Sequence, residues 1–267
     1  LRPRKPVDLL AQQLKALAER TGLATAQVSD TIIGRVTQTA EQGANIAKLA
    51  LVRAGWHDSV PGLSINRYCA SGLSAVHLAA QQAMDNNSLA VGGGVEMMSR
   101  VPMAADPGPL THDFEFQQQT TLVPIGISAD TVATQEGFSR EQCDAYAVAS
   151  QQRAVAALAQ GRFRSVVPVV DGQGAVLLAQ DETPRAQTSL ESLAALKPAF
   201  AAMAEKYGID PLMCERYGLE RIDHVQHAGN SPAMADGASA VLLASPGAAA
   251  KWGLKPRGRI LATATVS

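Results

Sequence analysis

The chain has 267 residues, of which 46% are hydrophobic and 18% charged, a composition that excludes a disordered chain and allows a sizeable buried core. Its formal net charge of -1 gives no general attraction to phosphate backbones, so we expect no nucleic-acid partner. Three widely spaced cysteines without a C-x-x-C pair argue against a disulfide framework and a zinc site, so we expect no bound metal.

The first hundred residues alternate between helical and strand patterns. Val7, Leu10 and Leu14 recur at steps of three and four residues, which predicts an amphipathic helix over residues 7–20. The apolar segments that follow predict a strand in residues 30–38, a helix in 43–56 and a strand in 88–99 that carries three glycines. Glycines in a strand indicate close approach of another backbone. This alternation predicts a layered α/β sheet.

After Met98 the chain leaves this pattern. A proline-rich stretch leads to a helical pattern in residues 139–163, and a second helix is expected in 188–200, with Thr188 or Ser189 as its N-cap. The glycine-linked apolar segment 235–245 then predicts a strand that rejoins the first sheet. The segment "RILATATVS" at the end is apolar and β-branched, which is typical of a strand. The chain starts without methionine, so we expect both ends to be cut from a longer protein.

Cys69 stands between a β-type segment and a helix start. The small residues Ala70, Ser71 and Gly72 follow it, and apolar residues then recur at helical spacing. Free amides and the macrodipole at a helix start favour a negative charge, and the thiolate is the nucleophilic form of cysteine. The pattern indicates a nucleophile, although a buried packing cysteine fits the local residues equally well.

Several segments resemble the thiolase family in the family's order. "NRYCASGLSA" resembles its nucleophile motif, and "EQGANIAKLALVRAG", "GGGVEMMSRVPM", "GFSREQCDAYAVASQQRA", "SLESLAALKPAF" and "HAGNSPAMADGASAVLLAS" resemble further thiolase segments. The resemblance implies the N-terminal half of a layered αβαβα fold with an inserted α+β loop domain. The expected parts are an N-terminal core in 1–100, a CoA-binding loop domain in 101–232, a return strand in 233–247 and the start of a C-terminal domain in 248–267.

The resemblance implies an acetyl-CoA C-acyltransferase. Cys69 is the expected nucleophile in the thiolytic cleavage of a 3-ketoacyl-CoA, or in the reverse condensation, through an acyl-enzyme. Its backbone amide is expected to stabilise the oxyanion. Coenzyme A enters as co-substrate, and no permanently bound cofactor is implied.

The inserted segment is expected to hold CoA. By the segment match, Arg185, Ser192 and Ala228 fall on positions that contact CoA in the family, and Ser231 is a further candidate. Pro232 stands where many thiolases have a serine, and Pro124 and Ile125 replace a histidine and a methionine of some acetyl-specific members. The Pro232 departure concerns a contact to the pantetheine part of CoA. The Pro124 and Ile125 departure favours the degradative thiolases, which accept a broader range of chain lengths.

Part of the family's machinery has no counterpart in these residues. The "GHP", "NEAF" and "C-x-G" motifs, which carry the catalytic histidine, an oxyanion asparagine and the second cysteine, do not occur. The chain is therefore expected to be either part of a full thiolase or a truncated homologue. Two alternatives stay open. One is a 3-ketoacyl synthase of the same broad fold, which also has a cysteine at a helix start, although "SREQCDAYAVASQQRA" and "SLESLAALKPAF" argue against it; the other is a non-catalytic CoA-binding protein that lost the second half. We expect a homodimer or homotetramer in the cytoplasm, without a membrane span.

Four other features are expected to be structural. Glu96 after the three glycines is predicted to be a buried, hydrogen-bonded carboxylate. His224 and His227 are three residues apart but have no third ligand nearby, which favours surface or packing roles over a metal site. Cys143 and Cys214 lack a glycine-rich helix start. Residues 201–223 form an insert that the shorter thiolases lack, and its role stays open.

Overall fold

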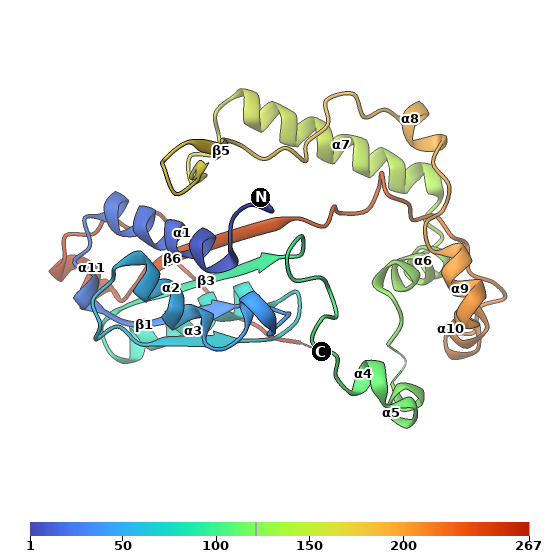
Figure 1. Ribbon diagram of the computed structural model, residues 1–267. Helices are drawn as coiled ribbons and strands as arrows, with labels where there is room; N and C mark the ends of the chain where they lie inside the picture. The colour runs from blue at the N-terminus through green and yellow to red at the C-terminus, as the bar shows by residue number, and fades with distance from the viewer. Residues whose placement is uncertain (121, 267) are drawn as a thin grey trace. The chain divides into compact units, whose positions relative to one another are not determined.

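The computed structural model describes residues 1–120 and 122–266 (Figure 1), and the chain divides into two compact units. The first, here called the core unit, comprises Leu1–Pro107, Val167–Ala179 and Ala235–Ser267. The second, called the helical unit, comprises Gly108–Val166 and Gln180–Met234. Each unit is therefore built from segments that are distant in the sequence.

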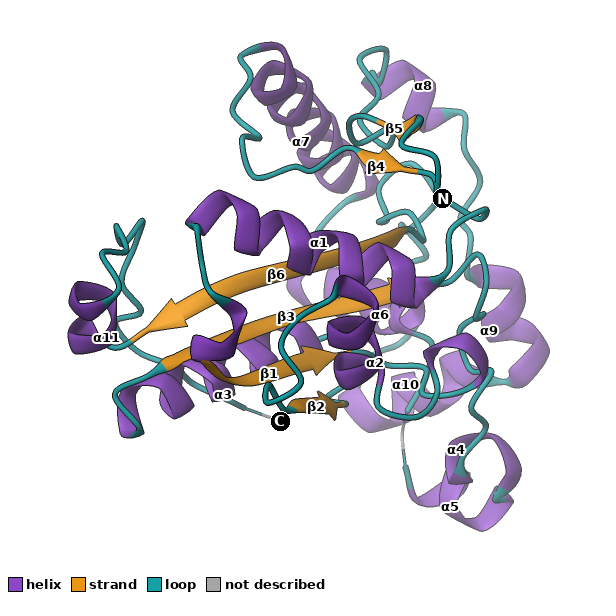
Figure 2. Cartoon of the chain, turned by 60° about the vertical axis from the view of Figure 1, so that its left-hand side comes forward, coloured by secondary structure: helices purple, strands orange, loops and turns teal. Residues whose placement is uncertain are grey.

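The core unit contains a four-stranded sheet in the order β2-β1-β3-β6 (Figure 2). β1 (Val28–Gly34) pairs in parallel with β2 (Gly62–Ile65) on one side and with β3 (Leu89–Met97) on the other. β6 (Asp236–Ala244) pairs with β3 in antiparallel orientation along the whole length of both strands. The strand predicted in residues 235–245 is confirmed, as is its return to the first sheet.

Helices cover the two faces of this sheet. α1 (Pro6–Thr21) and α2 (Ile46–Ala54) pack on one face, whereas α3 (Ser71–Asp85) packs on the other (Figure 2). Adjacent side chains of a strand point to opposite faces, and Ile33 accordingly lies in the core under α1 and α2, while Ile32 packs with the alanines of α3. The expected α/β fold is confirmed.

The remaining elements of the core unit lie at its margins. A short hairpin of β4 (Val169–Val170) and β5 (Val176–Leu178) packs against Leu9 of α1 and Met97 of β3. α11 (Pro246–Lys251) follows β6, and Ala248 joins the core under α1 and α2. Two single-turn 3-10 helices, η1 and η2, precede β1 and α2; their bounds are Thr25–Gln27 and Ala40–Gln42.

The prediction of a strand in "RILATATVS" is wrong for the residues that the structure describes. Residues 259–266 form neither helix nor strand. A strand needs a neighbour for its backbone hydrogen bonds, and a β-branched sequence cannot supply one. No strand among the described residues pairs with this segment.

The helical unit has all its described regular structure in helices. The two long ones are α6 (Ile125–Glu136) and α7 (Arg140–Ala159); the short ones are α4 (Pro109–His112), α5 (Phe114–Gln119) and α8 (Leu190–Ala194). The insert of residues 201–223 forms α9 (Ala201–Tyr207) and α10 (Ile209–Tyr217). Ile127 of α6 packs with Ala204 and Met213 of these two helices in one small core. Within the described residues, no helix is both long and apolar enough to cross a bilayer.

Candidate active site

Cys69 lies in a tight turn between the end of β2 and the start of α3. The helix begins at Ser71, with Ala70 as its N-cap residue, and the Cys69 thiol is exposed. Alanine has no side-chain oxygen with which to cap the first turn of α3. Cys69 is therefore an exposed residue beside the amino end of a 15-residue helix.

Hydrogen bonds hold this turn on both sides of the cysteine. The Tyr68 amide donates to Asn66 Oδ1 at 2.8 Å, and the Ser71 hydroxyl donates to the Tyr68 carbonyl at 2.6 Å. The same hydroxyl accepts from the Arg67 amide at 2.8 Å. Tyr68 itself has a φ of 46°, a left-handed conformation that a tyrosine rarely adopts. The turn therefore keeps one conformation against the intrinsic preference of its central residue.

Glycines place the start of α3 directly on the sheet. A Cβ atom on Gly34, the last residue of β1, would lie 2.3 Å from the Ser71 carbonyl carbon and 2.5 Å from the Gly72 amide nitrogen. A Cβ atom on Gly92 would lie 2.6 Å from the Cα of Val76. The close backbone approach predicted for the glycines of β3 is confirmed. These contacts set the distance between the sheet and the start of α3, and therefore also the position of Cys69.

Glu96 near the end of β3 has the hydrogen bonds predicted for it, but it is partly buried and not fully buried as predicted. Its carboxylate accepts from the Val36 amide at 2.7 Å and from Gln42 Nε2 at 2.6 Å. Gln42 is fully buried and accepts from the Met97 amide at 2.8 Å. The carboxylate therefore ties the loop that follows β1 to the end of β3.

Arg185 and Ser192 both lie on the surface of the helical unit. The Arg185 guanidinium is exposed, and its backbone amide donates to Gln151 Oε1 of α7 at 2.7 Å. Ser189 is the N-cap of α8, and Ser192 completes a capping box with it: the Ser192 hydroxyl accepts from the Ser189 amide at 3.0 Å. The prediction of Ser189 as a cap is confirmed, and the Ser192 hydroxyl has a local structural role.

Ala228 and Ser231 lie in a turn that packs against α8. Ala228 is exposed and Ser231 is partly buried. A Cβ atom on Gly229 would lie 2.4 Å from the Leu193 side chain, so the turn and the α8 helix touch. The structure thus brings Ser192, Ala228 and Ser231 to neighbouring elements of one unit, whereas Cys69 belongs to the other unit.

A buried ionic network under this turn escaped the sequence analysis. Asp144 Oδ1 of α7 accepts from Asn230 Nδ2 at 3.0 Å and lies 2.7 Å from Nε2 of the fully buried His227, while Arg140 Nε donates to Asp144 Oδ2 at 3.0 Å. The Gly229 amide donates to Nδ1 of His227 at 3.1 Å, so both ring nitrogens have a partner. Burial raises the pKa of Asp144, but its bonds to His227 and Arg140 outweigh this, and the pKa lies below its ordinary value.

His224 connects α6 with the insert. Its Nδ1 lies 2.8 Å from Asp130 Oδ2 of α6, and its Nε2 lies 3.0 Å from Asp210 Oδ2 of α10. Burial lowers the pKa of His224, but the two carboxylates more than offset this and raise it above its ordinary value. The carboxylates bond to different ring nitrogens, and within the described residues no group of three His, Cys, Asp or Glu side chains is arranged to hold a metal ion. No sequence spacing could have paired residues 94 positions apart.

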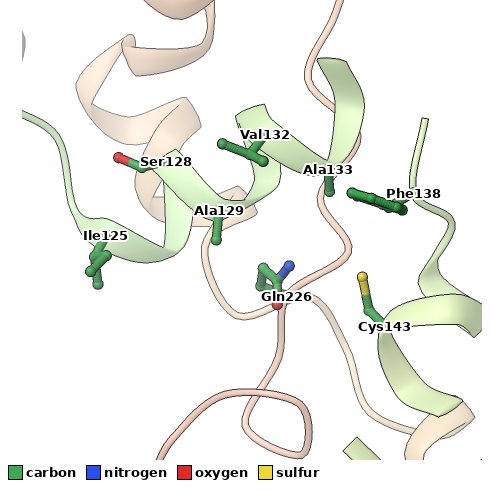
Figure 3. A pocket seen from close by; sticks show the side chains of 8 residues that line it. All are labelled: Ile125, Ser128, Ala129, Val132, Ala133, Phe138, Cys143 and Gln226. Atoms are coloured by element: carbon green, nitrogen blue, oxygen red, sulfur yellow. The ribbon is translucent and has the colours of Figure 1, made fainter. Parts of the chain in front are cut away.

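An apolar groove of about 400 Å³ runs along α6 in the helical unit (Figure 3). Burial raises the pKa of the Cys143 thiol in this groove, with the negative charge of Asp144 adding to the effect. Cys143 is therefore poorly suited to act as a nucleophile. The groove is lined by Ile125, Ser128, Ala129, Val132, Ala133, Phe138, Cys143 and Gln226.

The comparisons with known proteins agree on one family. The family model described as "Thiolase, N-terminal domain" matches residues 1–205. A β-ketoadipyl-CoA thiolase of Pseudomonas aeruginosa is 37% identical over 97% of this chain and 65% of its own length. A 3-ketoacyl-CoA thiolase of Pseudoalteromonas translucida is 36% identical, over 96% of this chain and 62% of its length. An acetyl-CoA acetyltransferase of P. aeruginosa is also 36% identical, over 97% and 65%.

The chain thus spans between 62% and 65% of the length of these three relatives. The match to the family model includes the turn of Cys69, the loop of Arg185 and the helix of Ser192. On this match the chain belongs to the thiolase family, and residues 1–205 correspond to the family's N-terminal domain.

Proposed function

We propose that this chain is the nucleophile-bearing part of an acetyl-CoA C-acyltransferase that cleaves 3-ketoacyl-CoA, or forms it in the reverse direction. The observation that carries the proposal is the exposed Cys69 thiol on a rigid turn at the start of α3, in a chain of the thiolase family. The printed names of the relatives, which include 3-ketoacyl-CoA thiolase and acetyl-CoA acetyltransferase, support this reaction class.

The reaction has two covalent steps. The Cys69 thiolate attacks the 3-keto carbonyl carbon, and the resulting oxyanion accepts hydrogen bonds from backbone amides at the start of α3. The oxyanion collapses and breaks the C2–C3 bond, so that the acyl group stays on Cys69 as a thioester. The departing carbanion takes a proton and leaves as acetyl-CoA. A second CoA thiolate then attacks the thioester and releases the shortened acyl-CoA with Cys69 as thiolate.

The reaction needs a general base and a general acid, and in thiolases both belong to the C-terminal half. A base must take the thiol proton, and an acid must protonate the carbanion; in the family these are the histidine of "GHP" and the cysteine of "C-x-G", and neither motif occurs in the 267 residues. General acid and base catalysis each contribute roughly 10² to 10⁴ in rate. We therefore expect residues 1–267 alone to show no measurable thiolysis.

CoA is proposed to bind the helical unit at Arg185, Ser192, Ala228 and Ser231. The exposed guanidinium of Arg185 suits a phosphate of the nucleotide end, because arginine forms charge-assisted bonds with phosphate oxygens. No permanently bound cofactor is proposed. The cytoplasm, with CoA and acyl-CoA as the small-molecule partners, is the proposed setting.

The complete protein is proposed to be a homodimer or homotetramer. Apolar side chains on the core unit support this: Leu73 and Met84 of α3 are 62% and 58% exposed, and Leu63 lies on the edge strand β2. Light scattering at micromolar concentration tests the proposal, and a monomer alone would contradict it.

Acylation of Cys69 is the direct test of the reaction. The protein that contains this chain at its natural length is mixed with acetoacetyl-CoA, quenched in acid and digested, and the acyl group is located by mass spectrometry. The peptide with Cys69 should carry it, and the peptides with Cys143 and Cys214 should not. The Cys69→Ala variant should lose both the adduct and the CoA-dependent decay of enolate absorbance.

The same experiment separates the proposed mechanism from the non-catalytic alternative. Full turnover by the Cys69→Ala variant would end the proposed mechanism. Binding of CoA without any acyl adduct in the unaltered protein would instead indicate a non-catalytic CoA-binding protein.

A further inference from the structure

We infer that Glu96 is a positioning residue for Cys69, acting through Val36 and Asn66 without touching the thiol. The inference rests on the proposed function, because it assigns a role to Glu96 in holding the proposed nucleophile. All the atoms involved belong to the core unit.

The first link joins Glu96 to Val36. Glu96 Oε2 accepts the Val36 amide at 2.7 Å, which places the carboxylate directly beside the loop that follows β1. Gln42 fixes the other carboxylate oxygen at 2.6 Å and is itself fully buried and bonded to the Met97 amide. A carboxylate held on both oxygens has one orientation, so it also sets the position of Val36.

The second link joins Val36 to the turn of Cys69. The Val36 carbonyl accepts from Asn66 Nδ2 at 3.0 Å, and Asn66 Oδ1 accepts from the Tyr68 amide at 2.8 Å. Asn66 therefore uses both ends of its side-chain amide, one toward the Val36 carbonyl and the other toward the residue that precedes Cys69. Removal of either end breaks the connection from Glu96 to the turn.

Arg35 also braces the loop that carries Val36. Arg35 is 3% exposed, and its guanidinium donates to the carbonyls of Gly43, at 3.2 Å, and Ala44. This bridge closes the loop of residues 35–44 on itself. These bonds hold Val36 in place within the loop. A shift of Val36 after loss of its hydrogen bond to Glu96 would therefore also move the Val36 carbonyl that Asn66 contacts.

The end of the relay is the strained residue Tyr68. A φ of 46° is unfavourable for a residue with a Cβ atom, so hydrogen bonds must hold it. Asn66 holds its amide, and Ser71 holds its carbonyl. When the Asn66 bond is lost, we expect Tyr68 to relax to negative φ, which turns the following Cys69 away from the amides of α3.

A direct charge effect of Glu96 predicts the opposite result for one variant. A nearby negative charge disfavours a thiolate, so neutral Glu96→Gln would make Cys69 more reactive if charge were decisive. Under the relay, the side-chain amide oxygen that Glu96→Gln introduces still accepts from Val36, so this variant retains most of the reactivity that Glu96→Ala loses. The pair of variants therefore separates positioning from electrostatics.

The test measures the alkylation rate of each cysteine by iodoacetamide, with Cys143 and Cys214 as internal references in the same molecule. Glu96→Ala and Asn66→Ala should each slow Cys69 about fivefold, the change that loss of one ordinary hydrogen bond gives, and the double variant should be no slower than either. Ser29→Ala serves as the matched control, because it removes the Ser29 hydroxyl bonds to Ser88 and Leu89 at the opposite end of β3.

The possible outcomes distinguish the relay from the proposed function. A Cys69 in the unaltered protein that reacts no faster than the two reference cysteines would overturn the proposed nucleophile. A fast Cys69 that keeps its rate in Glu96→Ala or in Asn66→Ala would overturn the relay alone, as would additive effects in the double variant. Because Asn66 is exposed, its substitution tests the relay even if Glu96→Ala fails to fold.

Discussion

Two glycines that face each other across the same contact should respond to alanine in opposite ways. Gly34 ends β1, and Gly72 lies in the first turn of α3 directly above it. We predict that Gly34→Ala destabilises the core unit strongly and that Gly72→Ala does not. Both changes add one methyl group, so their hydrophobic contributions are alike and only the surroundings differ.

The magnitude follows from the distances. A Cβ atom on Gly34 would lie 2.3 Å from the Ser71 carbonyl carbon, and ordinary contact begins at 3.4 Å, so the backbone at the start of α3 must retreat by 1.1 Å. Overpacking that side chains can absorb costs about 1–3 kcal/mol. Here the obstacle is backbone, so we expect about 3 kcal/mol. Among the described residues, no heavy atom outside the adjoining residues and the backbone of α3 itself lies within 4 Å of a Cβ on Gly72, and replacing glycine in a helix gains about 0.5–1 kcal/mol.

Tryptophan fluorescence during urea unfolding reports this difference in the core unit. Both tryptophans, Trp56 and Trp252, belong to that unit, and Trp56 is 6% exposed. The Gly34→Ala protein should also alkylate Cys69 more slowly, since the retreat of α3 moves the turn. A free energy of unfolding within about 0.5 kcal/mol of the unaltered protein for Gly34→Ala would refute the reasoning.

Three further predictions concern the helical unit. Because the pKa of His224 is raised, its ion pair with Asp210 is fully formed below about pH 6.5 and weakens as the pH rises through the folded-state pKa. Hydrogen-exchange protection of α10 should fall over the same pH range, and His224→Gln should abolish this pH dependence. Asp144→Ala leaves a buried histidine and an arginine without their partner and should cost about 3–5 kcal/mol, measured as lost hydrogen-exchange protection of α7; full protection would contradict this. Arg185→Glu should weaken CoA binding in calorimetric titration without unfolding the protein, whereas Arg216→Glu on α10 should not, and equal affinities would remove Arg185 from the site.

The regular elements follow from local sequence. Leu10 and Leu14 recur at helical spacing and are fully buried on α1, and Ser189 caps α8 as its side chain and position predict. The three consecutive glycines in β3 indicate close contact with another backbone, which the structure confirms at Gly92. The helical spacing and the cap depend on neighbours within a few residues, and the glycines show in the sequence itself that no side chain stands in the way of another backbone.

Features that depend on distant partners needed the tertiary structure. "RILATATVS" has strand-like residues, but no strand of the described chain pairs with it, and nothing in its composition reveals that. Asp144 and His227 are ordinary polar residues in the sequence, and only the packing of α7 against a turn 83 residues later makes them a buried pair. The same holds for Cys69: its motif is visible in the sequence, but the bond from Asn66 beside it to the Val36 carbonyl, 30 residues away, depends on the pairing of β1 with β2. The physical reason is that a buried hydrogen bond gains its value from the exclusion of water, and water is excluded by the whole fold.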